Sequence, residues 1–335
     1  MDRVLLSHGS GRGLNLLLDN IVLPVLTDGN SLYTEDAAIL QWDSMSKLAF
    51  TTDSFVVTPL SFPGGNIGKL AACGTINDLA MMGAIPKYMS VSLIIEDGFS
   101  VEKLKCYLKS LRDICVTNNV KIVCGDTKVV ESGNCDGLFI NTAGIGEFCQ
   151  GSTMLSARNT SDGDQVIVSG PIGLHGITIL AQRGNLSFAS NAISDCAPLS
   201  AMALHLMNAS NSVRVMRDAT RGGCAAILNE IAKSSDVTIR LDQSKIPVPD
   251  VVKGACSFLG LDPLQIANEG TFIAIVSPSD TQKCLDALHE LPEGKNAQCI
   301  GTVLKKGKYS VEMITEIGGI RPVEVPHGQL LPRIC

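Results

Sequence analysis

Aromatic residues and long apolar runs are both scarce in this 335-residue sequence. One tryptophan, four tyrosines and nine phenylalanines amount to 4% of the chain, whereas glycine contributes 32 residues. This composition is typical of a globular protein built from helices, strands and tight turns. No apolar run approaches the roughly 18 residues of a membrane span, and His8 and Arg12 interrupt the apolar start of the chain. We therefore expect no signal peptide, no membrane contact and a cytoplasmic protein.

Clustered basic residues and closely paired cysteines are also absent. The formal net charge is −6, and no run of lysine and arginine occurs, which argues against nucleic-acid and anionic membrane partners. The twelve cysteines include no Cys-x-x-Cys pair, and most lie in apolar runs such as Ile122-Val123-Cys124. This pattern predicts reduced cytosolic thiols rather than zinc ligands or disulfides.

Length and patterning predict two α/β domains and a tail. The chain suits two cores of roughly 150 residues each, and the polar segment 151–164 separates two series of strand-like and helix-like runs. We place the domains at 1–150 and 151–320. Expected strands are 48–52, 88–95, 121–124, 138–145, 165–169, 271–276 and 300–304, expected helices are 68–82, 101–118, 199–208 and 225–233, and 170–176 is a glycine-rich turn.

Residues 321–335 form the predicted tail. Their three prolines argue against both helix and sheet. Fully extended, the fifteen residues span on the order of 50 Å, enough to carry Cys335 between a partner and this protein's own cleft. A terminal thiol has no packing role, and the absence of three residues after it excludes a prenylation signal. Metal-binding, redox and carrier roles remain, and the extended tail favours a covalent carrier.

Four aspartates are candidate magnesium ligands: Asp36, Asp53, Asp78 and Asp126. Asp78 lies in an otherwise apolar helical stretch, where burying a carboxylate is unfavourable without a cation or donors. The other three lie where a strand or turn is expected to end. Magnesium takes carboxylate oxygens together with nucleotide phosphates, so a magnesium cluster would account for them. For each aspartate alone, a helix cap or an Asx turn is the alternative.

Two glycine clusters, His8–Gly13 and Gly64–Lys69, could hold phosphate. The first has Leu14 in place of the third Rossmann glycine, and the second has Pro63 and Leu70 where a P-loop needs glycine and Ser or Thr. A helix starting at Gly68 would offer N–H groups and the Lys69 cation to an anion. Simple turns are the alternative, and any nucleotide site must belong to another fold.

The second half contains two further clusters. Segment 217–223 places two arginines, Asp218 and a diglycine before a helix, and Asn268-Glu269-Gly270 precedes a strand. For Arg217 and Asp218 a surface ion pair is the alternative.

Together these segments resemble the HypE family of hydrogenase maturation factors, in the PurM-like ATP-binding superfamily. The similarity runs nearly end to end. The C-terminal Pro332-Arg333-Ile334-Cys335 separates this family from aminoimidazole ribotide synthetases and selenophosphate synthetases. One departure is Arg12, where a second glycine is expected after Gly11. The matching stretches are 8–11, 54–69, 73–78, 125–130, 218–223, 267–270 and 332–335.

The resemblance implies a PurM-like two-domain α/β (α+β) fold and a homodimer in which the N-terminal domains form a β-barrel. It also implies ATP and Mg²⁺ between the domains. The implied activity is that of an ATP-dependent carbamoyl dehydratase, a carbon–oxygen lyase. The resemblance further implies that a HypF-type carbamoyltransferase places a carbamoyl group on Cys335 and that this chain dehydrates the S-carboxamide to an S-cyanate. The cyano group then passes to iron on a HypC–HypD-type scaffold for a [NiFe] hydrogenase.

The resemblance also implies residue roles. Glu269 is the expected base, with Lys128 as the alternative. Magnesium would be held by Asp36, Asp53, Asp78 and Asp126, charge would be balanced by Lys69, Lys128 and Arg221, and the nucleotide site would include Gly9, Ser10, Gly11, Asn77 and Thr127.

Two other functions fit parts of the sequence. A selenophosphate synthetase carries its reactive cysteine or selenocysteine near the N-terminus, whereas the first cysteine here is Cys73. A non-catalytic scaffold would deliver a group or metal through Cys335, with the glycine and aspartate clusters purely structural. ATP turnover distinguishes the scaffold from the enzyme.

Overall fold

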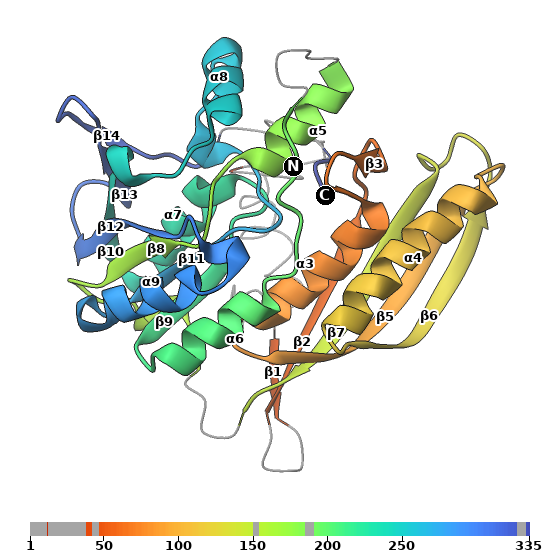
Figure 1. Ribbon diagram of the computed structural model, residues 1–335, viewed down its shortest axis with the longest axis horizontal. Coiled ribbons are helices and arrows are strands. Elements are labelled where there is room, and N and C mark those ends of the chain that lie inside the picture. Colours follow the sequence, from red (N-terminus) through yellow and green to blue (C-terminus); the bar gives the residue numbers. More distant parts are fainter. Residues whose placement is uncertain (1–11, 13–37, 42–46, 150–153, 185–190, 327–332) are drawn as a thin grey trace, which may run out of the picture.

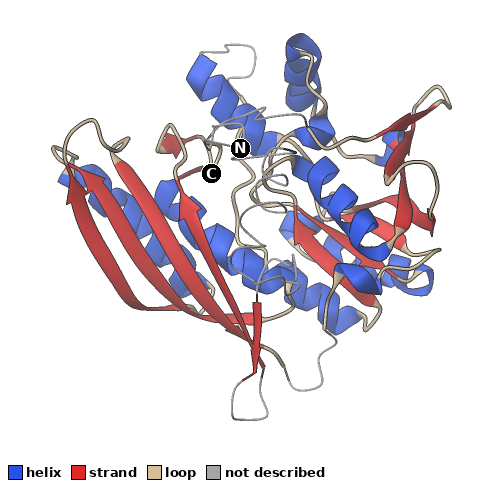
Figure 2. Cartoon of the chain, turned by 180° about the vertical axis from the view of Figure 1, so that it is seen from behind, coloured by secondary structure: helices blue, strands red, loops and turns tan. Residues whose placement is uncertain are grey.

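The computed structural model describes residues 12, 38–41, 47–149, 154–184, 191–326 and 333–335. They form two large β-sheets and a two-stranded sheet, β3-β4, with helices packed between and around the large sheets (Figures 1 and 2). Within these residues no helix is long and apolar enough to cross a membrane. Gly9, Ser10, Gly11, Asp36 and the expected domain boundary at residue 150 lie outside the described residues.

The first sheet is open, with strand order β1-β2-β7-β5-β6. Only β5 and β6 run parallel. Helices α3 and α4 cover one face, and Figure 2 shows the strands in front of them on the other. The described part of one chain therefore forms no closed barrel. The elements are β1 (Ala38–Gln41), β2 (Lys47–Phe55), β3 (Ser61–Phe62), β4 (Gly65–Asn66), α3 (Ile67–Met81), β5 (Ile85–Glu96), α4 (Val101–Thr117), β6 (Lys121–Val130) and β7 (Leu138–Glu147).

Helix α3 is the central element of the molecule. It contacts β2 and β7 on one side and α6 and β9 of the second half on the other (Figure 1). Asn66 caps its start, because the Asn66 side chain accepts hydrogen bonds from the N–H groups of Gly68 and Lys69 at 3.0 and 3.1 Å. Gly68 lets α4 approach, since a Cβ there would lie 1.9 Å from the Tyr107 carbonyl oxygen. In the described structure Asn66 therefore occupies two of the N–H groups that the sequence analysis offered to an anion.

The second sheet has seven strands in the order β14-β13-β10-β12-β8-β11-β9. All five residues of β11 are buried, which explains its continuous apolar run. The expected turn at 170–176 runs into α5, which begins at Leu174. The elements are β8 (Gln165–Val168), α5 (Leu174–Gly184), α6 (Ser200–Ala209), β9 (Val213–Asp218), α7 (Gly223–Ser235), β10 (Val237–Asp242), α8 (Asp250–Leu259), β11 (Phe272–Val276), α9 (Thr281–His289), β12 (Gln298–Lys305), β13 (Val311–Ile314) and β14 (Ile320–Pro322).

The predicted tail begins as part of this sheet. Strand β14 pairs antiparallel with β13, with Pro322 opposite Glu312. Proline is tolerated there because β14 is the edge strand, where a missing N–H breaks no ladder. The expectation that the chain leaves the sheet from residue 321 onwards was therefore wrong for Arg321 and Pro322.

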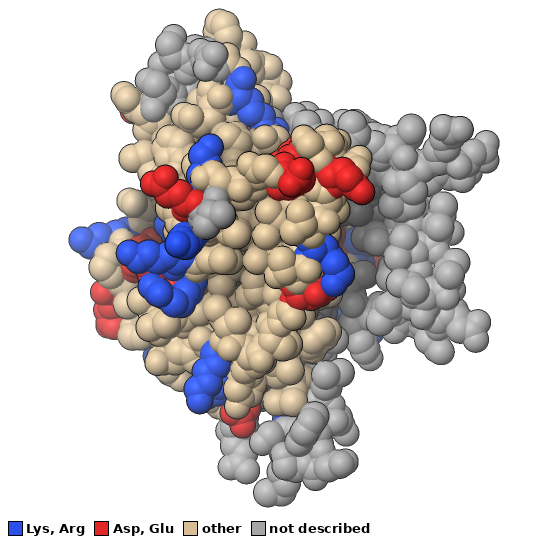
Figure 3. Space-filling view, turned by 90° about the vertical axis from the view of Figure 1, so that its right-hand side faces the viewer, with Lys and Arg blue, Asp and Glu red and all other residues tan. Residues whose placement is uncertain are grey.

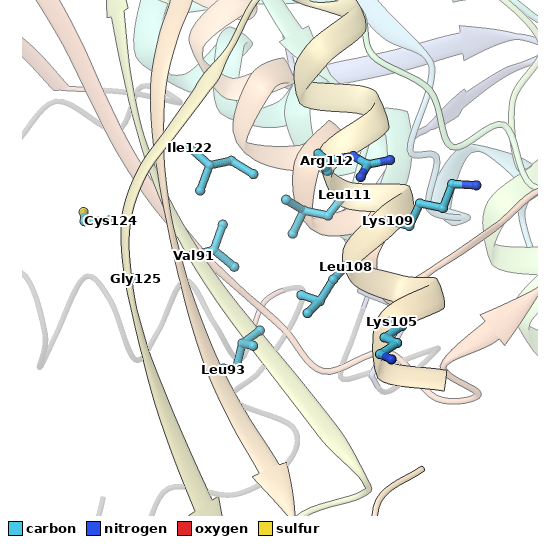
Figure 4. Close-up of a pocket in the computed structure, with 10 residues that line it drawn as sticks. All are labelled: Val91, Leu93, Lys105, Leu108, Lys109, Leu111, Arg112, Ile122, Cys124 and Gly125. Atoms are coloured by element: carbon cyan, nitrogen blue, oxygen red, sulfur yellow. The ribbon is translucent and has the colours of Figure 1, made fainter. Parts of the chain in front are cut away.

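An apolar groove of about 620 Å³ lies between α4 and strands β5 and β6. In Figure 4, Val91 and Ile122 from the strands face Leu108 and Leu111 from the helix. It exists because α4 packs mainly against α3 and leaves the outer strand uncovered. Figure 3 views this side of the molecule and shows its charged side chains in small separate groups on an otherwise uncharged surface.

Candidate active site

The last residue of the chain lies in a pocket between the two halves. The pocket has a volume of about 230 Å³. It is smaller than the roughly 300–1,000 Å³ of most ligand sites, and so suits a small group on a thiol. Its lining residues are Thr51, Thr52, Asp53, Phe55, Gly74, Asp78, Asp218, Thr220, Arg221, Glu269 and Cys335.

Main-chain hydrogen bonds hold the end of the tail. The N–H of Val56 donates to the main-chain oxygen of Cys335 at 3.1 Å, and the N–H of Thr58 donates to the main-chain oxygen of Arg333 at 3.3 Å. The Arg333 side chain donates back to the Val56 oxygen at 3.0 Å and also pairs with Asp136. The tail therefore docks like an added strand beside the segment that follows β2.

Strand β2 and helix α3 supply the acidic side of the pocket. Asp53 lies within β2 rather than after it, on the face that α3 covers, and Thr51 donates to Asp78 at 2.7 Å. Burial raises the pKa of Asp53, and Arg221 partly offsets this. Asp126 likewise lies within β6. The expectation that Asp53 and Asp126 follow strand ends was wrong, because both strands continue past them.

The turn between β9 and α7 supplies Asp218 and Arg221. Gly222 and Gly223 have φ of 78° and 60°, which side chains rarely adopt, and a Cβ at Gly223 would lie 2.5 Å from the Ile266 oxygen. Burial raises the pKa of Asp218 to about 6, with Arg217 opposing the shift and Asp53 adding to it. Arg217 and Asp218 are both buried, and Arg217 pairs with Glu230 at 3.1 Å. The surface ion-pair alternative was therefore wrong.

Arg221 is the cation of the pocket. Its pKa is raised, first by the Cys335 sulfur whenever that thiol is ionised and then by Asp53, Glu269 and Asp78, while burial opposes the shift. Burial in turn raises the pKa of the Cys335 thiol, so the docked thiol is protonated. A guanidinium in this position can balance negative charge that develops on a group attached to the sulfur.

Glu269 is a buried carboxyl whose Oε1 has no hydrogen-bond partner in the described structure. Burial raises its pKa well above the ordinary value, with further increases from Cys196 and Asp218. Its main chain is fixed, because Asp195 accepts from its N–H and Ala197 donates to its carbonyl oxygen at 3.2 Å. Of the two candidate bases, Glu269 lines the pocket with Cys335 and Lys128 does not.

The donor set suits magnesium that is shared with a phosphate. Among the described residues, no three His, Cys, Asp or Glu side chains are arranged to enclose a metal ion by themselves. Asp53, Asp78 and Asp218 nevertheless line one small pocket, and Asp53 raises the pKa of Asp218. Mg²⁺ binds through one or two carboxylates plus phosphates and waters, so a cation here would relieve that repulsion.

Several expected site residues lie elsewhere in the single chain. Asp126 and Lys128 are exposed on β6 and pair with each other at 2.7 Å, and Thr127 lies between them. Through the pairings of β2, β7, β5 and β6, Gly125 lies level with Asp53 and on the same face of the sheet. The next residue, Asp126, therefore points to the opposite face. One chain therefore does not unite Asp126 with Asp53 and Asp78.

Two other expected nucleotide ligands have structural partners. The buried Asn77 joins the halves, because its amide donates to the Ala197 oxygen at 3.2 Å and accepts from the Leu199 N–H at 2.7 Å. Lys69 donates to the Gly64 oxygen at 2.8 Å.

Among the residues that shape the site, the sequence analysis missed Asp195, His175, Arg183 and, as a pocket residue, Asp218. Asp218 carried a signal, since it precedes the Arg221-Gly222-Gly223 turn. The other three hold main-chain groups that are distant in sequence, which no local pattern reveals. Arg183, for example, donates to the main-chain oxygens of Thr58 and Arg333.

Comparison with known proteins identifies the class first. Residues 34–148 match the family described as AIR synthase related protein, N-terminal domain, and residues 161–314 match its C-terminal domain. These matches confirm the expected mixed α/β, PurM-like two-domain fold.

Closer relatives define the family within that class. Carbamoyl dehydratase HypE of Rhizobium leguminosarum bv. viciae is 44% identical over 99% of this chain and 95% of its own length, and that of Escherichia coli is 40% identical over all of both chains. A crystal structure of a HypE–HypF complex matches with a TM-score of 0.85 and 42% identity, covering 92% of this chain and 100% of that one. HypE in complex with ATP matches with a TM-score of 0.82 and 39% identity, covering 99% and 100%. The chain belongs to the carbamoyl dehydratase HypE family.

Proposed function

We propose that this chain uses ATP to dehydrate a carboxamide carried on the Cys335 sulfur to an S-cyanate, the precursor of the cyanide ligand of a [NiFe] hydrogenase. The main support is the position of Cys335, whose terminal thiol shares one small pocket with Arg221 and Glu269. A scaffold that only delivers a group would have no need of a buried carboxyl and a guanidinium at that thiol.

The proposed chemistry follows from the leaving group. An amide oxygen leaves poorly until it is phosphorylated. Removing the protons from nitrogen then expels phosphate and leaves a nitrile on sulfur. Glu269 accepts a proton from the nitrogen, and Arg221 balances the charge on the phosphorylated oxygen. Nearby negative charge raises the pKa of Glu269, so a cation beside Asp53 and Asp218 would favour the ionised, basic form.

ATP and magnesium are the proposed cosubstrate and metal. The relative whose structure is described as a complex with ATP shares 39% of its residues with this chain. Asp53, Asp78 and Asp218 would hold Mg²⁺, which supplies charge neutralisation for phosphoryl transfer. Asp36 and the glycines of segment 9–11 remain proposed ligands.

A homodimer would complete the site. Phe50, Tyr88 and Ile94 are 38%, 46% and 43% exposed on the face of the first sheet that α3 and α4 leave open. Asp126 and Lys128 share that face. A second copy packed there would bury the apolar side chains, close a barrel between the two sheets and bring Asp126, Thr127 and Lys128 toward a nucleotide.

Two kinds of partner are proposed. One crystallised relative is in a complex with HypF, and we expect a HypF-type enzyme to load Cys335 with a carbamoyl group. A HypC–HypD-type iron scaffold would receive the cyano group. Both transfers require Cys335 to leave the pocket, for which the tail has a reach on the order of 50 Å.

Intact-protein mass spectrometry tests the proposal. Wild type and Cys335→Ala are incubated with a HypF-type donor, carbamoyl phosphate and ATP. We expect a carbamoyl adduct on wild type that loses the mass of one water, and no adduct on the variant. Cys106→Ala is the control, because Cys106 is an exposed thiol on α4. The same cyanated product on Cys335→Ala would rule out the carrier, and absence of an adduct with an active donor would favour the scaffold.

A further inference from the structure

His175 and Ser194 form a buried relay that ends on the main chain of the docked tail. His175 lies on α5 and is completely buried. Its Nε2 is 2.8 Å from the carbonyl oxygen of Ile334, and its Nδ1 is 2.7 Å from the hydroxyl oxygen of Ser194. The Phe62 ring packs against the imidazole at an interplanar angle of 84°, with 5.3 Å between ring centroids.

The partners of the ring fix its tautomer. A main-chain carbonyl only accepts hydrogen bonds, so the Nε2–H must donate to Ile334. The Ser194 oxygen accepts from the Cys196 N–H at 3.1 Å, which leaves its own proton for Nδ1. Burial lowers the pKa of His175 to about 4, consistent with a neutral ring. The relay therefore runs from the Cys196 main chain through Ser194 and His175 to Ile334.

Ser194 belongs to a short segment that also fixes the Glu269 loop. The next residue, Asp195, accepts from the N–H groups of Glu269 and Gly270 at 3.1 and 3.0 Å. The Ser194 N–H donates to the Pro63 oxygen at 3.0 Å, which ties the segment to the first half of the chain. One rigid segment thus sets the position of both the tail carbonyl and the carboxyl that shares the pocket with Cys335.

We propose that His175 and Ser194 are positioning residues that recognise the Ile334 carbonyl and thereby hold Cys335 in register with Glu269 and Arg221. His175 contacts the main-chain oxygen of Ile334, so the recognition does not depend on the Ile334 side chain. The inference deepens the proposed function by naming the docking site of the loaded tail. A purely structural histidine would stabilise the fold without controlling access to Cys335.

The rate of Cys335 alkylation by iodoacetamide tests this, measured on the C-terminal peptide of the full-length protein. His175→Leu removes both ring nitrogens, whereas His175→Gln retains an N–H donor near the Nε2 position. Loss of a hydrogen bond worth about 1 kcal/mol predicts alkylation roughly fivefold faster in His175→Leu. His175→Gln should stay close to wild type. The exposed Cys106 serves as the internal reference. Equal Cys335 rates in wild type and His175→Leu, with unchanged Cys106 rates, would overturn the proposal.

Two further variants keep the test decisive. Ser194→Ala removes the hydroxyl but leaves the imidazole, and should also accelerate Cys335 alkylation, even if His175→Leu does not fold. His289→Leu is the control for a histidine whose hydrogen bond lies away from the tail, because its Nε2 is 2.9 Å from the Ala297 oxygen. Equal acceleration in His289→Leu would indicate general destabilisation and refute the relay. The assay contains neither ATP nor a carbamoyl donor, so its outcome is separate from that of the dehydratase test.

Discussion

Asp195 holds the main chain of Glu269: its carboxylate oxygens lie 3.1 and 3.2 Å from the Glu269 nitrogen. The same carboxylate accepts from Gly270 at 3.0 Å and from Thr271 Oγ1 at 3.3 Å. Gly270 is required by this close approach, since a Cβ there would lie 1.8 Å from the Asp195 carbonyl oxygen. The position of the proposed base is therefore set by a residue more than seventy positions earlier in the chain.

Asp195→Asn should slow dehydration without abolishing the fold. In this variant the side-chain amide oxygen can accept from only one of the N–H groups of Glu269 and Gly270. The side-chain NH₂ group then faces the other N–H group, which is left without an acceptor. An unsatisfied buried donor costs about 1–3 kcal/mol, which corresponds to a rate about tenfold or more lower if the Glu269 loop shifts. Single-turnover dehydration of carbamoylated protein measures this. Asp162→Asn is the control, because Asp162 accepts from the Lys305 N–H in an exposed turn; equal losses in both variants would contradict the specific role of Asp195.

Glu269→Gln should reduce dehydration by about 100-fold or more, the usual effect of removing a general base. The fold should persist, because the amide has nearly the same size as the buried carboxyl. Lys128→Met is the comparison, since Lys128 is the alternative base on exposed β6. A mild effect of Glu269→Gln with a severe effect of Lys128→Met would assign the base to Lys128.

Asp218→Asn should stabilise the protein in the absence of ligands yet remove its response to magnesium and ATP. Its pKa is raised to about 6 from 3.8, first by burial, so the ionised carboxylate destabilises the folded state above that pH. The penalty at pH 7.5 is about 3 kcal/mol and disappears as the pH falls toward 4. Thermal unfolding with and without Mg-ATP checks both effects. The exposed Asp286→Asn is the control, and a variant that Mg-ATP still stabilises as much as wild type would argue against Asp218 as a ligand.

The difference in stability between wild type and His175→Gln should depend on pH. The pKa of His175 is lowered from 6.5 to about 4, chiefly by burial. The folded state is therefore stabilised by the neutral His175 ring, fully above pH 6.5, and this contribution to the free energy of unfolding is lost as the pH falls toward 4. Between pH 7.5 and 5.0, wild type should lose about 2 kcal/mol relative to the variant, which has no titrating ring. Denaturant unfolding at both pH values measures this, and a constant difference would show that the ring is not buried neutral.

Ile94→Asp should produce monomers and weaken ATP turnover. Ile94 is 43% exposed on the open face of the first sheet, beside Lys128 of β6. A carboxylate there would have to lose its water in the proposed dimer, and the neighbouring Lys128 is already paired with Asp126. Light scattering gives the oligomeric state. Val116→Asp is the matched control, because Val116 is 65% exposed on α4. A dimer that survives Ile94→Asp would place the interface elsewhere.

The sequence determined the local structure and the chemical inventory. Apolar periodicity identified α3, α4 and the first-sheet strands β2, β5, β6 and β7, because side-chain spacing reflects burial within one element. The terminal position of Cys335 and the family motifs predicted roles for the thiol, Arg221 and Glu269, which the structure brings into one pocket. These features are local, so they can be read without knowing what packs against them.

Only the tertiary structure decided which of these groups meet. Asp53 and Asp126 have similar surroundings in the sequence, yet strand pairing turns them to opposite faces of one sheet. His175 reaches Ile334 across 159 positions, and such contacts arise when two separately patterned domains pack together. The physical reason is that successive side chains of a strand point to opposite faces of the sheet, so the sequence defines two faces but does not say which one is functional. The packing of one face against α3 and the second domain decides which face forms the site.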